Sequence, residues 1–443
     1  MDKETAVSCV YKSYEKAAKN LNREWQDSKK RNPALTREWI RSLCKAPAIV
    51  ITGSKGKGSV AYMLAKVLEL RKKTGLMTSP HINDFTERFR INSKVISDEK
   101  FCGIMSFLQE ELDRIERDLS EWEYISPMGI QAVAALHYFN GENTDINVFE
   151  CGKGAAYDDV NNVIHEYAVI NTIFMEHTRE LGNSIEEIAR DKAAIITSDT
   201  RCVYMANQIK AAEEVILARA KMMQIPVKTY GVDFWCENTE FTPSGMKTDV
   251  VLQKCCYRNL ELPLLGEHQV RNLALALAVV ADIEENITED ELRECLKQLN
   301  WPGRMEMISA KPPVVLDACI NRDSAENVKN VLKKMPVSSW DFIIGVPDDK
   351  DYAGVIETVS DMAENIFLVK TENPYYIFSD IQAETIKKIG HRPLGIMNLA
   401  EAVNRVKKNN RACCILGTTG LVSQVHRQKQ FLFGNRVNDD EWK

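Results

Sequence analysis

A glycine-rich loop between an apolar strand and a helix is the strongest structural signal in this chain of 443 residues. The loop reads Gly53-Ser54-Lys55-Gly56-Lys57-Gly58-Ser59. The β-branched run 48–52 before it predicts a buried strand, and 60–68 after it predicts an amphipathic helix with its apolar residues on one face. A strand, a glycine turn and a helix N-terminus together direct backbone N–H groups at an anion. The sequence therefore predicts a phosphate-binding loop in an α/β sheet.

Residue types within the loop suggest individual roles. Lys57 can reach terminal phosphates, and Ser59 offers a hydroxyl where a metal-bound phosphate would lie. The loop departs twice from the common pattern G-x-x-x-x-G-K-[ST], because Ile51 replaces the first glycine and Gly58 separates the lysine from the serine. The candidate phosphate-binding residues are Gly53, Lys55, Gly56, Lys57, Gly58 and Ser59.

Composition and charge narrow the class of protein. The chain carries 57 basic and 63 acidic residues, a net charge of −6, and no basic run, so nucleic acid is not an expected partner. No apolar stretch approaches the roughly 18 residues of a membrane span, and the N-terminus lacks the basic-then-apolar order of a signal peptide. The 12 cysteines include no C-x-x-C pair, which favours reduced thiols over a zinc site. We therefore expect a cytoplasmic protein without a membrane partner.

The pattern along the chain predicts an α/β protein in three parts. Residues 1–45 are charged and helical in pattern, with Trp25 among their apolar anchors. Residues 46–302 alternate strands with helices and predict a P-loop-type, mainly parallel sheet, with a small β-rich subdomain at about 229–263. A second, smaller alternation at 303–443 predicts a Rossmann-like α/β domain.

Polar residues follow several predicted strands of the larger domain. Ser79 follows the strand 75–78, Glu150 ends another, and His177 lies shortly after a third. Ligands of open α/β sheets collect at the carboxyl ends of strands, where a hydroxyl, a carboxylate and an imidazole could hold Mg²⁺ against triphosphate oxygens. Each residue alone is more commonly a cap or a surface residue. Their shared position beside the loop favours a metal site.

Lys192 lies on the apolar face of a predicted helix, with Ile185 and Ile188. Desolvation there would lower the pKa of the amine and make its neutral form reactive. A lysine whose head reaches out to solvent is the ordinary alternative, and the pattern alone favours it.

Three further polar residues have both a functional and an ordinary interpretation. Asn272 shares a helical face with Gln269 and could read the edge of adenine or cap a helix. Arg304 lies at the predicted domain junction, where it could reach a phosphate or form a surface ion pair. Asp317 ends the first strand of the second domain and could bind ribose hydroxyls or cap a loop.

Together, these segments resemble the Mur ligase superfamily, specifically its folylpolyglutamate synthase/dihydrofolate synthase branch. The resemblance covers about residues 46–425, with the motifs in the family's order. The loop is close to the family's G-T-N-G-K-G-S. The other matches are T-S-P-H-I at 78–82, L-G-x-H-Q-x-x-N at 265–272, W-P-G-R at 301–304 and D-K-D at 349–351.

This resemblance implies a fold and a mechanism. ATP would phosphorylate a substrate carboxylate, and the amine of an amino acid, possibly glutamate, would attack the acyl phosphate to give an amide. Domain closure would assemble the site, and a monomer is favoured because related ligases are often monomeric. Catalytic roles would fall to Lys57, His177 and Lys192. ATP would contact the loop, Asn272, Arg304 and Asp317. Two Mg²⁺ ions would be held by Ser59, Ser79, Glu150, His177 and a carbamoylated Lys192.

Several family positions differ in this chain. In the family's E-V-G-x-G-G-R-x-D-A-T-N, here at 150–161, Ala155 and Ala156 replace a glycine and the arginine. Ile320 stands where the family has histidine, and Lys55 where it has asparagine. These changes favour a ligase of specialised metabolism with an altered substrate. Folate polyglutamylation is the first alternative, and a nucleotide-binding regulatory protein that has lost ligation is the second.

Overall fold

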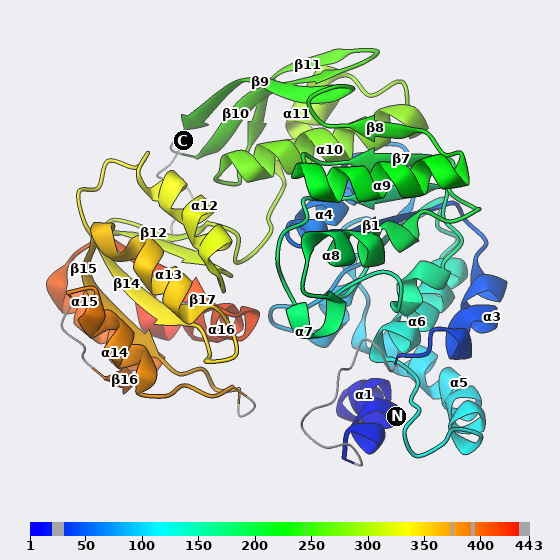
Figure 1. Cartoon of the computed structure of the whole chain (residues 1–443), viewed down its shortest axis with the longest axis horizontal. Coiled ribbons are helices and arrows are strands. Elements are labelled where there is room, and N and C mark those ends of the chain that lie inside the picture. Colours follow the sequence, from blue (N-terminus) through cyan, green and yellow to red (C-terminus); the bar gives the residue numbers. More distant parts are fainter. Residues whose placement is uncertain (20–30, 243, 374–375, 391–394, 434–443) are drawn as a thin grey trace. The chain divides into compact units, whose positions relative to one another are not determined.

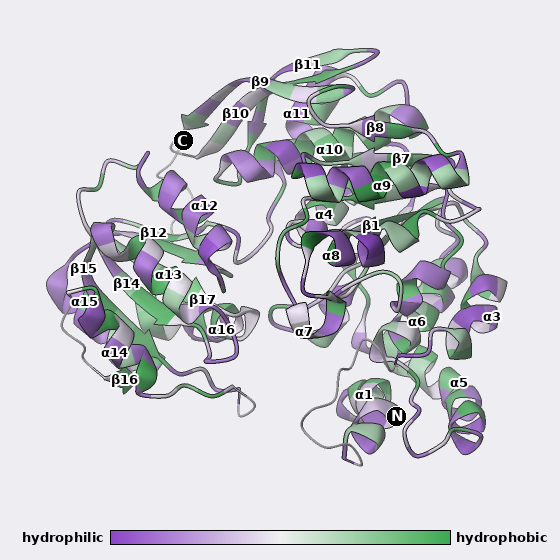
Figure 2. Ribbon diagram, in the orientation of Figure 1, coloured by the Kyte–Doolittle hydropathy of each residue, from purple (hydrophilic) through white to green (hydrophobic). Residues whose placement is uncertain are grey.

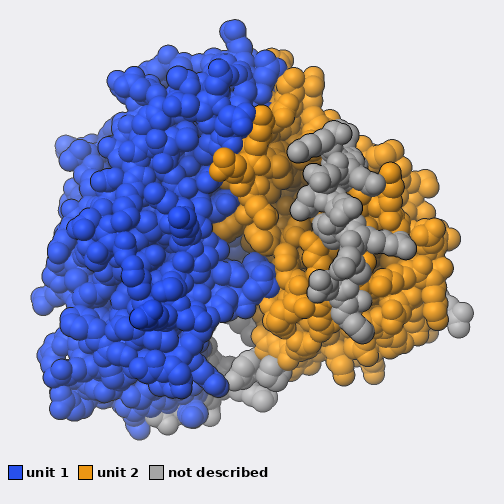
Figure 3. Space-filling view, turned by 180° about the vertical axis from the view of Figure 1, so that it is seen from behind, with its two compact units in different colours: residues 1–237, 249–260, 271–296 blue, residues 238–248, 261–270, 297–443 orange. Residues whose placement is uncertain are grey.

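The computed structural model describes residues 1–19, 31–242, 244–373, 376–390 and 395–433 (Figure 1). Trp25 lies outside these residues. Contacts divide the chain into two compact units, which Figure 3 colours separately. Unit 1 comprises residues 1–237, 249–260 and 271–296, and unit 2 comprises 238–248, 261–270 and 297–443. The domain limits drawn from the sequence stay a prediction.

Unit 1 is built on an eight-stranded sheet with the order β4-β3-β2-β5-β1-β6-β7-β8. Six strands run parallel, and β3 and β4 are antiparallel at one edge. Both central strands, β1 and β5, are buried along their whole length, as expected for a parallel sheet covered on two faces. The α/β prediction is confirmed. The strands are β1 (Ala48–Thr52), β2 (Thr74–Met77), β3 (Phe89–Ile91), β4 (Lys94–Val95), β5 (Ile146–Glu150), β6 (Tyr167–Ile170), β7 (Cys202–Met205) and β8 (Val227–Thr229).

The helix after the loop, α4 (Lys57–Leu68), is not the amphipathic helix that the sequence predicts. Nine of its 12 residues are buried, and it packs on β1, β2 and β5. Its other side is covered too, since the Cys295 thiol donates to the Lys66 carbonyl at 3.3 Å. A helix that is apolar nearly all round belongs in a core. The loop is therefore anchored on a buried helix.

The helices near the N-terminus form a group in unit 1 (Figure 1). They contact one another in the pairs α1–α5, α1–α6, α3–α6 and α5–α6. Trp39 and Leu43 pack against the hydrophobic core, as the sequence suggests. These helices are α1 (Lys3–Lys19), α3 (Ala34–Leu43), α5 (Asp98–Arg117) and α6 (Pro127–Gly141). The remaining helices between β6 and β8 are α7 (Thr178–Leu181), α8 (Ile185–Lys192) and α9 (Lys210–Met223).

The buried carboxyl group of Asp159 accepts a hydrogen bond from α3 and so connects this helix to the rest of unit 1. The Thr36 hydroxyl donates to Asp159 Oδ1 at 2.5 Å, while Asp159 Oδ2 is buried without a hydrogen-bond partner among the described residues. Burial raises the pKa of Asp159 to about 6. The adjacent Asp158 is also buried and its pKa is raised, so ionisation of this pair is unfavourable.

The pKa of Asp159 predicts how stability changes with pH. A carboxyl group whose pKa is higher in the folded protein binds more protons there, so its contribution to stability is present at low pH and is lost as the pH rises through about 6. An Asp159→Asn variant does not ionise. We expect its free energy of unfolding, relative to wild type, to rise by about 2 kcal/mol between pH 4.5 and 7.5, measured by urea unfolding. The exposed Asp118→Asn is the control, and a difference that is constant with pH would contradict the prediction.

A separate three-stranded sheet lies in the part of the sequence predicted to be β-rich. Its order is β11-β10-β9, formed by β9 (Phe234–Thr242), β10 (Gly245–Leu252) and β11 (Cys256–Leu262). The contact-based division runs through this sheet and through the helix that follows. That helix is α10 (Glu267–Ile283), and α11 (Glu289–Lys297) comes after it.

Unit 2 contains a six-stranded sheet with the order β12-β13-β17-β14-β15-β16. All neighbours are parallel except β12, which is antiparallel to β13. Figure 2 shows apolar strands here beside helices with hydrophilic outer faces. The strands are β12 (Glu306–Ala310), β13 (Pro313–Asp317), β14 (Trp340–Gly345), β15 (Ala363–Val369), β16 (Ile396–Met397) and β17 (Cys413–Gly417). The helices are α12 (Arg322–Leu332), α13 (Tyr352–Val359), α14 (Ile381–Lys388), α15 (Leu399–Asn409) and α16 (Thr419–Phe433).

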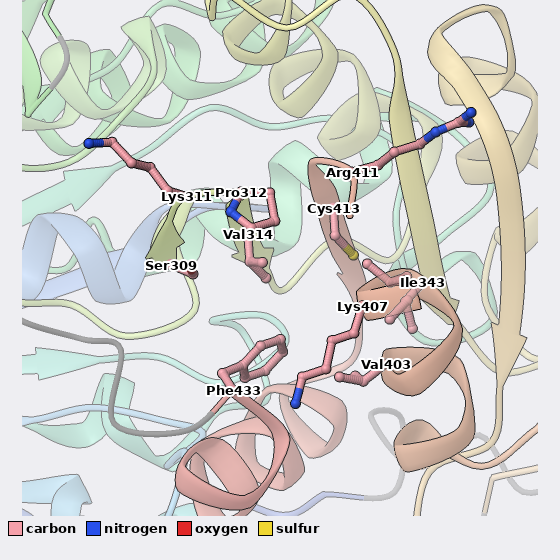
Figure 4. A pocket seen from close by; sticks show the side chains of 11 residues that line it. Ser309, Lys311, Pro312, Val314, Ile343, Val403, Lys407, Arg411, Cys413 and Phe433 are labelled. Atoms are coloured by element: carbon pink, nitrogen blue, oxygen red, sulfur yellow. The ribbon is translucent and has the colours of Figure 1, made fainter. Parts of the chain in front are cut away.

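A cavity lies within unit 2 (Figure 4). It encloses about 490 Å³, part of it open to solvent. Val314 and Cys413 line it near the amino ends of β13 and β17, whereas Asp317 ends β13 at the opposite edge. The cavity is therefore apart from the predicted ligand residues of this sheet. No described helix is long and apolar enough to cross a membrane.

Candidate nucleotide and metal site

The carboxyl ends of four neighbouring strands meet at one edge of the unit 1 sheet. In the parallel register, Ile51 of β1 pairs with Glu150 of β5, and Thr52 pairs with Ile170 of β6. On the other side of β5, Met77 of β2 pairs with Phe149. The loop, the segment after β2, Glu150 and the segment after β6 therefore lie side by side. The sequence predicts this grouping from strand ends alone, and the strand order brings it about.

The loop is shaped by two glycines in the left-handed half of backbone space. Gly53 has φ of 142° and Gly56 has φ of 76°. A Cβ atom on Gly53 would lie 2.8 Å from the Asn171 Cβ, and one on Gly56 would lie 2.6 Å from the Asn171 Nδ2. Both the conformation and the space therefore require glycine. The Lys57 ammonium donates to the Gly53 carbonyl at 2.9 Å, which folds its side chain back over the loop. Lys55 and Gly58 are partly buried in the same loop.

Lys192 lies directly beneath this loop. Its side chain is fully buried and its ammonium donates to the carbonyls of Gly53 and Lys153, each at 3.0 Å. It also forms an ion pair with Glu176 at 3.0 Å. Burial lowers the pKa of Lys192, Glu176 opposes this, and the nearby Lys57 adds to it. The snorkelling alternative is excluded, since no part of the head reaches solvent.

Three of the side chains predicted to bind Mg²⁺ lie in the loop or at the ends of neighbouring strands, namely Ser59, Ser79 and Glu150. The Ser59 hydroxyl is buried and has no hydrogen-bond partner among the described residues. Glu150 is 5% exposed, and its Oε2 accepts the backbone N–H of Ser79 at 2.9 Å. A buried hydroxyl without a described partner in the loop and a buried carboxylate at the end of β5 are oxygen donors of the kind that Mg²⁺ takes, since it binds one or two carboxylates and completes its shell with water and phosphate oxygens.

His177 begins the short helix α7 in a left-handed conformation, with φ of 46°. Its Nε2 lies 3.9 Å from the Glu176 carboxylate, the same carboxylate that pairs with Lys192. The Glu176 carboxylate thus lies between His177 and Lys192. Nowhere in the described ranges do three or more His, Cys, Asp or Glu side chains form a group that could hold a metal alone.

The segment after Ser79 contains a buried cation, Arg88, which matches a family motif in the sequence but to which the sequence assigns no role. Arg88 is 8% exposed and donates through Nε to His81 Nδ1 at 3.0 Å and through Nη1 to Gln131 Oε1 at 2.7 Å. Burial, together with the positive charge of Arg88, lowers the pKa of His81 to about 4. The imidazole is therefore neutral at physiological pH, with Nδ1 as an acceptor.

Asn272 lies beside the loop in unit 1, as the nucleotide prediction requires. Asn171, just past the end of β6, donates through its Nδ2 to Asn272 Oδ1 at 2.9 Å, and both side chains are buried. Sequence reasoning missed Asn171. Its only signal was a polar residue at a strand end.

Arg304 and Asp317 are close together within unit 2. Asp317 Oδ2 accepts the backbone N–H of Met305 at 2.9 Å, and the Arg304 guanidinium donates to the Gly303 carbonyl at 3.0 Å. The same turn is fixed by Glu306, which accepts the Gly303 N–H at 2.9 Å. The W-P-G-R segment and the end of β13 thus form one small polar surface.

The Mur ligase middle domain family matches residues 51–280, more than half of the chain. The chain belongs to the Mur ligase family. A dihydrofolate synthase/folylpolyglutamate synthase of Bacillus subtilis is 29% identical to this Mur ligase over 397 residues, covering 87% of this chain and 90% of the relative. Mycobacterium tuberculosis folylpolyglutamate synthase complexed with ADP and AMPPCP is similar with a TM-score of 0.84 at 25% identity, covering 90% of this chain and 95% of that one. An FPGS–AMPPCP–folate complex gives a TM-score of 0.81 at 25% identity, with coverage of 98% and 100%.

These similarities confirm the branch as well as the family. The chain is a folylpolyglutamate synthase-like Mur ligase, and therefore an ATP-dependent acid–amino-acid ligase. Asp191 Oδ1 accepts the Ala155 N–H at 2.8 Å, in the segment where the family arginine is missing.

Proposed function

We propose that this Mur ligase activates a small-molecule carboxylate as an acyl phosphate with MgATP and joins it to the amine of an amino acid. The observation that carries the proposal is that Lys57 of the loop and the buried Lys192 converge on one carbonyl of the phosphate loop. The amines of Lys57 and Lys192 both donate to the Gly53 carbonyl, at 2.9 and 3.0 Å. Lys57 is the cation placed at the loop for a reaction in which charge grows on phosphoryl oxygens, and Lys192 is the amine beside it that would be carbamoylated.

Each site residue has a role that its geometry supports. Lys57, part-buried in the loop, turns from the Gly53 carbonyl to the phosphoryl group when ATP binds. The glycine backbone of the loop and the amino end of α4 receive the phosphates. Asn272 contacts the nucleotide from the side of Asn171. Arg304 and Asp317, which lie together in unit 2, stay a prediction for nucleotide binding.

We propose that Mg²⁺ is held on one side by Ser59, Ser79 and Glu150 and on the other by His177 and a carbamoylated Lys192. The unpartnered Ser59 hydroxyl and the oxygen-rich donor set support the first group. The lowered pKa of Lys192 supports carbamoylation, because only the neutral amine attacks CO₂, with release of one proton. Bound Mg²⁺ would neutralise phosphate charge.

The residues that differ from the family motifs bear on which carboxylate the enzyme accepts. The replacements at Ala155, Ala156 and Ile320 favour a carboxylate other than folate, in specialised metabolism. Folate glutamylation is the second candidate, supported by relatives named for it that cover most of the chain. The buried, ion-paired Lys192 weighs against a regulatory protein that has lost ligation.

Phosphate release tests these proposals. Purified protein with MgATP is supplied with tetrahydrofolate, dihydropteroate or other small carboxylates, each with single amino acids, and products are identified by mass. We expect release that requires both a carboxylate and an amino acid. Turnover with a folate and glutamate alone would establish the second candidate instead, and nucleotide binding without release under any combination would favour the regulatory protein.

A further inference from the structure

Lys153 contacts both parts of the structure that carry His177 and Lys192, the two residues proposed to hold one of the Mg²⁺ ions. Its main-chain carbonyl accepts from the Lys192 ammonium at 3.0 Å. Its own ammonium donates to Glu180 Oε1 at 3.1 Å, and Glu180 lies in α7, the short helix that His177 begins. One residue therefore links the peptide that Lys192 contacts to the turn that carries His177.

The main chain around Lys153 is held on both sides by buried or partly buried carboxylates. The N–H of Gly152 donates to Asp158 Oδ2 at 2.7 Å, and the N–H of Ala155 donates to Asp191 Oδ1 at 2.8 Å. These bonds do not involve the Lys153 side chain. A substitution of that side chain therefore keeps the carbonyl to which Lys192 donates.

The turn of α7 depends on tertiary contacts for its position. The helix has four residues, which are too few to be stable alone. The N–H groups of Glu180 and Leu181 both donate to the His177 carbonyl, at 2.9 and 2.8 Å, so these three residues belong to one turn. Leu181 packs into the hydrophobic core, and the ion pair of Glu180 with Lys153 is a further attachment of the same turn.

This ion pair is a feature of this chain and not of the family pattern. In E-V-G-x-G-G-R-x-D-A-T-N the position of Lys153 is open, and Lys153 is the one basic residue of 150–161, since Ala156 replaces the arginine. The Lys153 and Glu180 side chains are 38% and 21% exposed. A pair so exposed contributes little to the stability of the whole chain, so a role in placing a single turn is the larger consequence.

We propose that Lys153 is a positioning residue that holds the turn of His177 in place relative to Lys192, so that both reach one divalent cation. Residues that orient metal ligands commonly change metal affinity by about 10- to 100-fold. The effect of Lys153 should be smaller, about fivefold, because its ion pair is partly exposed and acts through the backbone. The inference rests on the proposed metal role of His177 and Lys192.

Binding of Mn²⁺ to the full chain tests this role, with a non-hydrolysable ATP analogue and bicarbonate present and the free ion counted by electron paramagnetic resonance. Lys153→Met removes the ammonium and keeps an unbranched side chain. We expect the Mn²⁺ site that is lost in His177→Ala to bind about fivefold more weakly in Lys153→Met, while the other site is unchanged. In phosphate release, the KM for Mg²⁺ should rise by the same factor, with kcat at saturating Mg²⁺ nearly unchanged.

Two further comparisons separate positioning from a general loss of structure. Exchange of the charges, in Lys153→Glu with Glu180→Lys, re-forms the pair and should restore most of the Mn²⁺ affinity. In a His177→Ala background, Lys153→Met should have no further effect on Mn²⁺ binding, because its effect passes through His177.

Lys72→Met is the matched control, because Lys72 is also 38% exposed and pairs with Glu284 at 2.9 Å, before the amino end of β2 and so away from the site. It should bind Mn²⁺ as the wild type does. If Lys153→Met binds Mn²⁺ as the wild type does, or weakens both sites equally, or if the exchanged pair restores nothing, the positioning role is overturned. A wild-type chain that binds only one Mn²⁺ with the analogue, or none, would instead overturn the proposed second metal site.

Discussion

Replacing Lys57 by alanine is expected to lower kcat about 10³-fold, with little change in the temperature of unfolding. Among the described residues, the ammonium donates to the Gly53 carbonyl alone, at 2.9 Å, and this carbonyl also accepts from Lys192. Its removal therefore leaves no buried acceptor unpaired. The variant lacks the cation that stabilises the charge developing on the phosphoryl group. Positioned cations of this kind account for much of the rate enhancement of phosphoryl transfer.

Initial rates of phosphate release, together with thermal unfolding of the same preparation, measure this effect. Lys210→Ala is a matched control, because that lysine is 89% exposed and forms a surface ion pair with Glu214. A Lys57→Ala enzyme that keeps wild-type kcat would show that the loop lysine has no part in the chemistry. A weaker affinity for ATP with unchanged kcat would limit its role to binding.

Loss of Lys192 is expected to affect both activity and stability. In Lys192→Met, the carboxylate of Glu176 loses its partner at 3.0 Å, and the Lys153 carbonyl loses its donor. Breaking a buried ion pair from one side costs about 3 to 5 kcal/mol, so the variant should unfold at a clearly lower temperature. Activity should fall about 10²-fold or more, because the anionic metal ligand that we propose at this position cannot form.

A double variant separates the two effects. Lys192→Met with Glu176→Gln removes both charges, and replacing a buried pair by neutral groups of similar volume is often nearly neutral for stability. We expect the double variant to regain most of the unfolding temperature while phosphate release stays low. Recovery of both properties together would contradict a chemical role for Lys192 and leave it a structural residue. The bicarbonate dependence of the wild-type rate provides an independent readout of carbamoylation.

Local patterns in the sequence are sufficient to predict the strands and the loop of unit 1 and most of its candidate site residues. Apolar β-branched runs ending in polar residues predicted β1, β5 and β6, since burial on both faces of a parallel sheet demands such runs. The glycine pattern predicted the loop, because left-handed backbone at Gly53 and Gly56 excludes other residues. The positions of Glu150 and His177 at or after the ends of strands predicted that they belong to the site. These signals are short-range and can be read without knowledge of the fold.

Other properties depend on residues far apart in sequence, and local patterns do not encode them. The sequence predicts an amphipathic α4, and this prediction is wrong, because α4 is buried on nearly all sides. Periodicity does not report what covers the second face of a helix. The pattern around Lys192 favoured a solvent-reaching side chain, yet the fold brings it to Gly53, 139 residues away, and pairs it with Glu176.

The sequence by itself thus determined an α/β Mur ligase with a phosphate loop and the set of polar residues at its strand ends. Only the tertiary structure decided how those residues are partnered. Asn171 and Asn272 meet across 101 residues in a hydrogen bond that no local motif specifies. The physical reason is that backbone conformation follows from neighbouring residues, whereas the partner of a buried polar group follows from strand order and from the need to satisfy every donor and acceptor away from water.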